Sequence, residues 1–435
     1  MLAQKIDGGE GTERDFTACT IRGAGLVLHA VALLAPGCAG PAGGEGGTAA
    51  VLTDTGGAIE RVVTVVNSPR RSGLRNQVLI QNIVQGLGPR ARVLVLAPPE
   101  MILDPNPAPD RMWFAEIPDG LDFSIWPQDP FVVLLGPGGD GSLLASRSYG
   151  RSEDREMARI VAATLGWKVE ESSLFFAGGN LLSDERHLFV GASLIHKNAE
   201  DLELSEGDVV ARFEGELGRP AIVLGSPPQP TAHMDMVFTP LGANRVALAD
   251  SHLGAELAEL ELAQRPEAVR AFEEHAESYF FGHPDVQSVT LPTGRAVQAP
   301  PVVDRTAEAI ADSRLGAEAL DVIAADLQRR GYSVLRVPFL TTRENRHPRQ
   351  RSSGFPAGYP VLTYNNVLVE REGNQERVYL PEYGFPGLDM AARRIWESAG
   401  FEVRLIRGLT TSAMYQGSLR CTVKVLTRSS EPDPR

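Results

Sequence analysis

The stretch MAARRIWESAGFEVRLIRG, residues 390–408, joins the two kinds of element whose repetition decides the fold. Apolar residues recur with helical spacing up to Gly400, and a short apolar strand pattern, FEVRLI, follows directly. A glycine at the end of a helix supplies the left-handed backbone conformation that stops it. The stretch therefore predicts a helix that ends at Gly400 and turns at once into a strand.

The same order occurs in four earlier stretches, which are QNIVQGLGPRARVLVLAP (81–98), REMARIVAATLGWKVEE (155–171), FEGELGRPAIVLGS (213–226) and LDVIAADLQRRGYSVLRVP (320–338). Their helix-ending glycines are Gly88, Gly166, Gly218 and Gly331. Strand patterns precede each helix, among them two predicted hairpins. We therefore predict an α/β fold of five strand–strand–helix–strand modules, with a largely helical insertion at about 254–301. An ordinary α/β sheet with accidental similarity is the alternative.

Charge and cysteine usage limit the possible functions. With a net charge of −13, the chain lacks the excess of basic residues that is typical of nucleic-acid-binding proteins. A small cationic substrate remains possible. Cys421 is the only cysteine within residues 60–435, so an internal disulfide there is excluded. A single cysteine is either a small buried hydrophobe or a catalytic nucleophile whose histidine and aspartate partners meet it only in the fold.

Residues 1–57 differ in composition from the rest of the chain. Arg22, the apolar run Leu26 to Leu34 and the small residues around Cys38 are typical of a secretory leader. The run is too short for a transmembrane helix. A Gly-rich linker is expected to follow, at 40–57, before a single domain at 58–435. We expect an exported protein (periplasmic, lipoprotein or secreted). A disordered tail, or a cytoplasmic protein with a mis-assigned start, is the alternative, and lipidation of Cys38 stays open.

Three stretches place polar residues at predicted strand ends of different modules. They are IWPQDPFVV with Asp129, FFAGGNLL with Asn180, and TAHMDMVFTP with His233 and Asp235. Alternation along a strand would put His233 and Asp235 on one face. Each has a plainer interpretation: a turn cap for Asp129, a simple turn for Asn180, and a polar pair at a sheet edge. Because Cys421 also lies at a strand end, a closed ring of modules would gather all of them in a central pocket.

Together these side chains suit chemistry at a guanidino group. Two carboxylates can hold a planar guanidinium through paired, charge-assisted hydrogen bonds. A thiolate can then attack its central carbon, and a histidine can protonate the departing amine and later activate water. Metal binding is the competing interpretation, but one Cys, one His and two Asp in these contexts match no usual zinc spacing. No metal and no cofactor are therefore predicted.

The stretches IWPQDP, GGN, HMD and GSLRC, in this order, resemble the motifs of the guanidino-group-modifying enzymes of the pentein superfamily, over about Arg61 to Arg428. That group includes arginine, agmatine and peptidylarginine deiminases and the amidinotransferases. The resemblance implies a five-bladed α/β propeller of ββαβ modules around a central pocket. It also implies Cys421 as the nucleophile that forms an amidino-thioether, His233 as general acid and base, Asp129 and Asp235 as the guanidinium clamp, and Asn180 near the pocket.

Other residues bear on the substrate. Ala177 stands where arginine and agmatine deiminases carry a glutamate, and the peptidylarginine deiminases lack that glutamate too, so a peptidylarginine-like member is favoured. Trp126 and Arg147 are predicted to bind substrate, with Arg151 as a further candidate for a carboxylate or a peptide carbonyl. The long basic loop 341–360 is a candidate lid, and a solvated surface loop is the alternative. No calcium site is implied.

We therefore expect a deiminase that converts arginine or peptidyl-arginine to citrulline and ammonia. Its partner would be a small guanidino molecule or an arginine-containing peptide, with no nucleic acid and no membrane span. An amidinotransferase with the same nucleophile, and a non-catalytic guanidine-binding propeller, are the alternatives. The identity of the guanidine and the oligomeric state stay open at this stage.

Overall fold

The computed structural model describes residues 49–67, 74–101, 110–136, 139–147, 151–291, 294–343 and 358–429. The predicted leader up to residue 48 lies outside the described residues, and so does most of the candidate lid, at 344–357. In the part of the chain that is described, no helix has the length and apolar character needed to cross a membrane.

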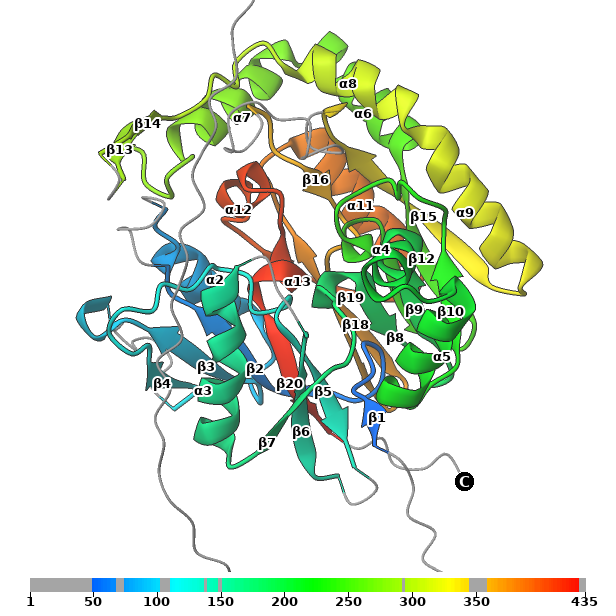
Figure 1. The fold of residues 1–435 in the computed structure, drawn as a ribbon. Coiled ribbons are helices and arrows are strands. Elements are labelled where there is room, and N and C mark those ends of the chain that lie inside the picture. The colour runs from blue at the N-terminus through cyan, green and yellow to red at the C-terminus, as the bar shows by residue number, and fades with distance from the viewer. Residues whose placement is uncertain are drawn as a thin grey trace, which may run out of the picture. The chain divides into compact units, whose positions relative to one another are not determined.

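The described strands form small separate sheets, and five of these sheets repeat one pattern. Two strands pair antiparallel, a helix follows, and a last strand pairs parallel with the second (Figure 1). One unit consists of β5 (Phe131–Leu135), β6 (Gly141–Ala145), α3 (Glu156–Leu165) and β7 (Lys168–Glu171), and the next of β8 (Leu181–Ser183), β9 (Leu188–Gly191), α4 (Ala192–Leu202), α5 (Glu206–Leu217) and β10 (Ala221–Leu224). A third consists of β11 (Phe238–Gly242), β12 (Arg245–Asp250), α9 (Ala317–Arg329) and β15 (Ser333–Leu340). A fourth consists of β17 (Leu368–Glu372), β18 (Gln375–Pro381), α11 (Pro386–Ser398) and β19 (Glu402–Ile406). The prediction of a mixed α/β fold is confirmed. The alternative, one ordinary α/β sheet, is wrong for the described strands, which form separate sheets.

The fifth unit is assembled from both ends of the domain. The C-terminal strand β20 (Lys424–Arg428) pairs antiparallel with β2 (Ile59–Val65). After β2 come α2 (Gln77–Gly86), β3 (Arg92–Ala97) and β4 (Met112–Glu116), with β3 parallel to both β2 and β4. Figure 1 shows β20, in red, alongside β2, in blue. Because Cys421 lies in α13 (Leu419–Thr422), just before β20, this pairing fixes the position of the cysteine.

Four of the five predicted helix-ending glycines have the left-handed conformation, with φ of 71° at Gly166, 66° at Gly218, 87° at Gly331 and 94° at Gly400. The prediction for Gly88 is wrong. Helix α2 already ends at Gly86, and Leu87 after it is extended. Gly88 instead permits a close approach: its N–H donates to Tyr379 Oη at 2.8 Å, and a Cβ would lie 3.0 Å from that oxygen.

Residues 49–57 belong to the folded domain, so the predicted linker extends too far. The short strand β1 (Ala50–Val51) pairs antiparallel with β5. Asp54 exchanges two hydrogen bonds with Ser183, since its N–H donates to Ser183 O and its carboxylate accepts from Ser183 N, both at 2.8 Å. These contacts attach the segment to two units, and the fold begins before residue 58.

The predicted insertion lies between β12 and β15. It contains α6 (Ser251–Gln264), α7 (Pro266–Ser278) and a hairpin of β13 (Ser288–Thr290) and β14 (Ala296–Gln298), and α8 (Thr306–Leu315) follows it. The hairpin was not predicted, because its strands are only three residues long. The remaining short elements are η1 (Pro99–Met101), η2 (Ser152–Arg155), η3 (Gly178–Asn180), η4 (Met234–Met236), β16 (Leu362–Thr363) and α12 (Thr410–Met414).

Candidate active site

A cavity of about 150 Å³ lies where segments of different units meet. Its walls include Trp126 and Asp129 from the segment before β5, His233 from the residue before η4, and Cys421 from α13. Asp235 does not line the cavity. It is fully buried, but its charge still acts on the Cys421 thiol. The structure therefore brings Cys421, His233 and Asp129 to one cavity and holds Asp235 within electrostatic reach.

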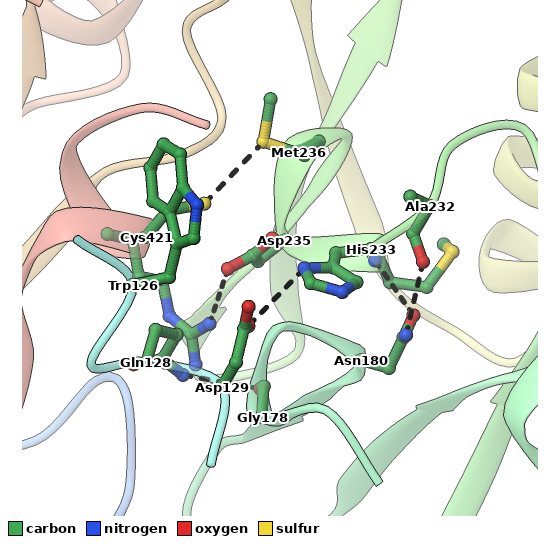
Figure 2. Close-up of polar contacts among 12 residues, drawn as sticks. Trp126, Gln128, Asp129, Gly178, Asn180, Ala232, His233, Asp235, Met236 and Cys421 are labelled. Atoms are coloured by element: carbon green, nitrogen blue, oxygen red, sulfur yellow. Dashed lines mark hydrogen bonds and ion pairs between the residues drawn. The ribbon is translucent and has the colours of Figure 1, made fainter. Parts of the chain in front are cut away.

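Cys421 is 4 % exposed, and Asn366 contacts it twice. Asn366 accepts a hydrogen bond from Cys421 N at 3.1 Å and donates from Nδ2 to Sγ at 3.3 Å. On another side, Sγ lies 3.8 Å from Met236 Sδ (Figure 2). Burial raises the pKa of the Cys421 thiol well above its ordinary value, and the charges of Asp235 and Asp129 raise it further. These surroundings therefore favour the protonated form of the thiol.

The imidazole of His233 faces Asp129, with Nδ1 3.4 Å from Oδ1 (Figure 2). A carboxylate at Nδ1 orients the ring and leaves Nε2 for another partner. The ring packs against Gly179, where a Cβ would lie 2.7 Å from Nδ1 and 2.9 Å from the histidine Cβ. A Cβ at Gly178 would lie 2.1 Å from Gln128 O. Both glycines of the GGN stretch are therefore needed for close approach.

The expected strand alternation of His233 and Asp235 is wrong. Residues Met234–Met236 form the 3₁₀ turn η4, and strand β11 begins only at Phe238. The backbone turns at these residues on the cavity wall before the chain joins the sheet. The alternation of side chains that a strand would give therefore begins only with β11. His233 is therefore on the cavity wall, while Asp235 is fully buried and pairs with Arg420.

Asp235 is paired with an arginine inside the protein. Its Oδ2 accepts a hydrogen bond from Arg420 Nη1 at 2.8 Å, and Arg420 Nη2 also pairs with Asp54 Oδ1 at 2.9 Å. The other oxygen, Asp235 Oδ1, is buried and has no hydrogen-bond partner among the described residues. Burial raises the pKa of Asp235, while the nearby Arg420 and His233 lower it in part. One oxygen is thus used by the fold and the other lacks a donor.

Asn180 holds the histidine segment and does not line the cavity. Its Oδ1 accepts from Met234 N at 3.1 Å and from Gln229 Nε2 at 2.8 Å, and its Nδ2 donates to Ala232 O at 3.2 Å (Figure 2). These contacts tie η3 to the residues on both sides of His233. This geometry therefore does not support contact between Asn180 and substrate. It supports a role for Asn180 in positioning His233.

Alanine at Asn180 is expected to cost about 1–3 kcal/mol of unfolding free energy, because Met234 N and Gln229 Nε2 lose a buried acceptor. It is also expected to lower activity by displacing His233. Asn198→Ala is a matched control, since Asn198 is equally buried and makes three such bonds away from the cavity. Chemical denaturation and kinetics on both variants test this. Similar activity losses in the two variants would contradict a positioning role.

The remaining predicted residues differ in their placement. Trp126 lines the cavity, and its ring packs so closely on Gly417 that a Cβ there would lie 2.2 Å away. Arg147 is exposed and is not part of the cavity wall. Arg151 lines the cavity and pairs with Asp129. Within the described ranges, no group of three or more His, Cys, Asp and Glu side chains has an arrangement that could hold a metal ion.

Asn366, Arg420 and Asp54 were not predicted as parts of the site. Arg420 adjoins Cys421 in the GSLRC stretch, and Asn366 ends the short NN pair before β17. Their adjacency to a candidate nucleophile and a strand was the only available signal. Asp54 had none, because its partners lie 129 and 366 positions away in the sequence.

No protein-family model and no curated protein sequence matches this chain. Solved structures do. An agmatine deiminase of C. jejuni is 12 % identical with a TM-score of 0.56, over 88 % of this chain and 98 % of that one. An agmatine deiminase of Enterococcus faecalis is 12 % identical with a TM-score of 0.56, over 87 % of this chain and 96 % of that one. The similarity spans nearly the whole of both relatives, and this chain shares the mixed α/β fold of these structures.

Proposed function

We propose that this protein is a cysteine-dependent hydrolase of a guanidino group, a deiminase, with Cys421 as its nucleophile. The observation that carries the proposal is the buried Asp235 Oδ1, which has no donor among the described residues and belongs to a carboxylate whose charge reaches the Cys421 thiol. A guanidinium N–H would satisfy that oxygen. In this proposal the five units are the blades of a five-bladed propeller, and the cavity lies at its centre.

Substrate binding would also activate the nucleophile. A guanidinium between Asp129 and Asp235 brings a positive charge next to the two carboxylates that raise the thiol pKa. An opposite charge near a site favours its ionised form. The bound cation therefore lies next to both carboxylates and favours the thiolate.

The first chemical step forms a C–S bond and breaks a C–N bond. The thiol proton passes to His233, and the Cys421 thiolate attacks the central guanidinium carbon. His233 then donates that proton to a terminal nitrogen, which leaves as ammonia. The product of the step is a cationic amidino-thioether on Cys421. Its positive charge stays beside Asp129 and Asp235.

The second step replaces sulfur with oxygen. His233, now neutral, removes a proton from water, and the oxygen adds to the amidino carbon. The C–S bond breaks, the hydroxyl proton of the intermediate passes to solvent, and a ureido group is released. The departing thiolate takes the proton back from His233, which restores the starting state. The net reaction is guanidino group plus water to ureido group plus ammonia. With arginine or peptidyl-arginine as substrate, the product is citrulline or peptidyl-citrulline.

The proposal is tested by measuring ureido product from the full chain. The substrates are free arginine, agmatine, dimethylarginine and a blocked arginine peptide, and the same peptide with lysine is the control without a guanidine. We expect ureido product and an equal amount of ammonia from at least one guanidine. Addition of glycine tests transfer, since guanidinoacetate in place of ureido product identifies an amidinotransferase. Absence of both products on all four substrates rejects the proposal.

A further inference from the structure

The guanidinium of Arg151 already lies at the proposed substrate carboxylate. Its Nη2 is 2.8 Å from Asp129 Oδ2, and its Nε is 3.0 Å from Asp154 Oδ2. The Arg151 side chain is 31 % exposed on the cavity wall, whereas the two carboxylates are 4 % and 0 % exposed. A guanidinium supplied by the chain therefore makes a contact of the kind that the substrate would make.

The two ends of this contact are anchored unequally. Asp154 is fixed from behind, since its Oδ1 accepts from Ser124 N at 2.7 Å and its Oδ2 from Ser124 Oγ at 2.6 Å. The contact of Arg151 with Asp154 uses Nε, next to the side-chain stem, and the contact with Asp129 uses a terminal nitrogen. Because the guanidinium is planar and rigid, Nε and Nη2 move together. Rotation about the side-chain stem can therefore release Asp129, while Asp154 stays held by Ser124.

Arg420 provides the contrast. It is 6 % exposed and is held by Asp54, Asp235 and a backbone carbonyl, and it does not line the cavity. A ligand in the cavity reaches Arg151 but not Arg420. Of these two internal guanidiniums, Arg420 is a fixed part of the fold and Arg151 is the one that a ligand can displace.

We propose that Arg151 is an internal competitor of the substrate: it occupies the guanidinium position at Asp129 and is displaced when substrate binds. This inference rests on the proposed function for the location of the substrate. The occupied state lowers the apparent affinity of every cationic ligand by the fraction of molecules in which Asp129 is open. A guanidinium forms the lost contact with Asp129 again through its own directed N–H donors. Arg151 therefore competes with the substrate for Asp129 and lowers the affinity for all cations by the same factor.

The test measures binding without turnover, in a Cys421→Ala background of the full chain. Calorimetry at constant ionic strength compares methylguanidine with methylammonium, and arginine with agmatine. We expect Arg151→Met to bind methylguanidine about tenfold more tightly, because Asp129 is open in every molecule. Affinity for methylammonium should rise by the same factor, because the fraction of molecules with Asp129 open does not depend on the ligand. Arg155→Met is the matched control, since Arg155 ends the 3₁₀ turn η2 that Arg151 precedes, is 30 % exposed and pairs with Glu171 at the surface.

A second variant separates displacement from simple removal of charge. Arg151→Lys keeps the charge but lacks the second nitrogen needed to contact both carboxylates, so it too should bind methylguanidine more tightly than the parent. Parent-like affinity in Arg151→Lys, or unchanged or weaker affinity in Arg151→Met, overturns the inference. Weaker binding of arginine with unchanged binding of agmatine also overturns it, since that pattern assigns Arg151 to a substrate carboxylate. Arg151→Lys also serves if Arg151→Met does not fold.

Failure of the proposed function and failure of this inference give different results. If no guanidine yields ureido product but both Arg151 variants gain affinity, the hydrolase is wrong and the displaced guanidinium stands. If ureido product forms but the variants lose affinity, the hydrolase stands and the role of Arg151 is wrong.

Discussion

Alanine in place of Cys421 is expected to lower ureido formation by at least about 10⁴-fold, because no other group can form the covalent intermediate. The expected cost in stability is small, about 1 kcal/mol for the lost sulfur volume. Wild-type protein quenched in acid during turnover should carry, on the peptide with Cys421, the added mass of the substrate less ammonia. Initial rates, peptide mass analysis and thermal unfolding together measure the three effects.

Met236→Leu is the matched control for this result. Met236 Sδ is the other sulfur at the site, 3.8 Å from the thiol, and leucine keeps its approximate volume. We expect a change of only a few-fold in rate. A Cys421→Ala protein that retains its fold and more than a tenth of the wild-type rate would remove the cysteine from the mechanism.

Methionine in place of Lys424 is expected to stabilise the protein strongly at and below neutral pH. Lys424 opens strand β20, is 7 % exposed and faces a small cavity with Asp54, Gln128 and Arg420. Burial and, next, the charge of Arg420 lower the pKa of Lys424 to about 7, against the opposing effects of Asp54, Asp129 and Asp235. Since the ordinary pKa of lysine is about 10.4, the shift corresponds to at most about 5 kcal/mol.

The direction with pH follows from proton binding. Between about pH 7 and pH 10 the unfolded chain binds a proton at Lys424 that the folded chain does not, so the free energy of unfolding rises with pH over this window. Below about pH 7 both states are protonated and the folded state carries the full cost of the buried charge. The stability advantage of Lys424→Met should therefore be largest near pH 6.5 and should shrink by several kcal/mol by pH 10.

Chemical denaturation of wild type and Lys424→Met at several pH values measures this difference. Lys168→Met is the matched control, because Lys168 also opens a strand, β7, but is exposed. The control should show a small effect that does not change between pH 6.5 and pH 10. An advantage of Lys424→Met that is equally flat with pH would mean that Lys424 stays charged in the folded state.

Local sequence patterns were sufficient for the repeated unit. A helix of period 3.6 that ends at a glycine and continues into a strand is specified by neighbouring residues, and the left-handed Gly166, Gly218, Gly331 and Gly400 follow it. Gly88 failed because its role comes from Tyr379, which lies 291 positions away and is invisible to a local pattern.

The candidate site also has a part that local sequence predicts and a part that it does not. Polar residues beside predicted strands were the basis for choosing Cys421, His233 and Asp129, and all three line one cavity in the fold. The 3₁₀ turn at Met234–Met236, the support of Cys421 by Asn366 and the pairing of Asp235 with Arg420 were not predictable, because each depends on contacts between different units.

By itself, the sequence determined the α/β class, the order of strands and helices in each unit, and the residue types available for reaction at a guanidino group. Only the tertiary structure decided that β20 completes the sheet of β2, that Asp235 keeps one oxygen without a donor, and that Arg151 pairs with Asp129. The physical reason is range. Backbone conformation and periodicity depend on residues a few positions apart, whereas burial and charge pairing depend on side chains that meet only after the units have packed.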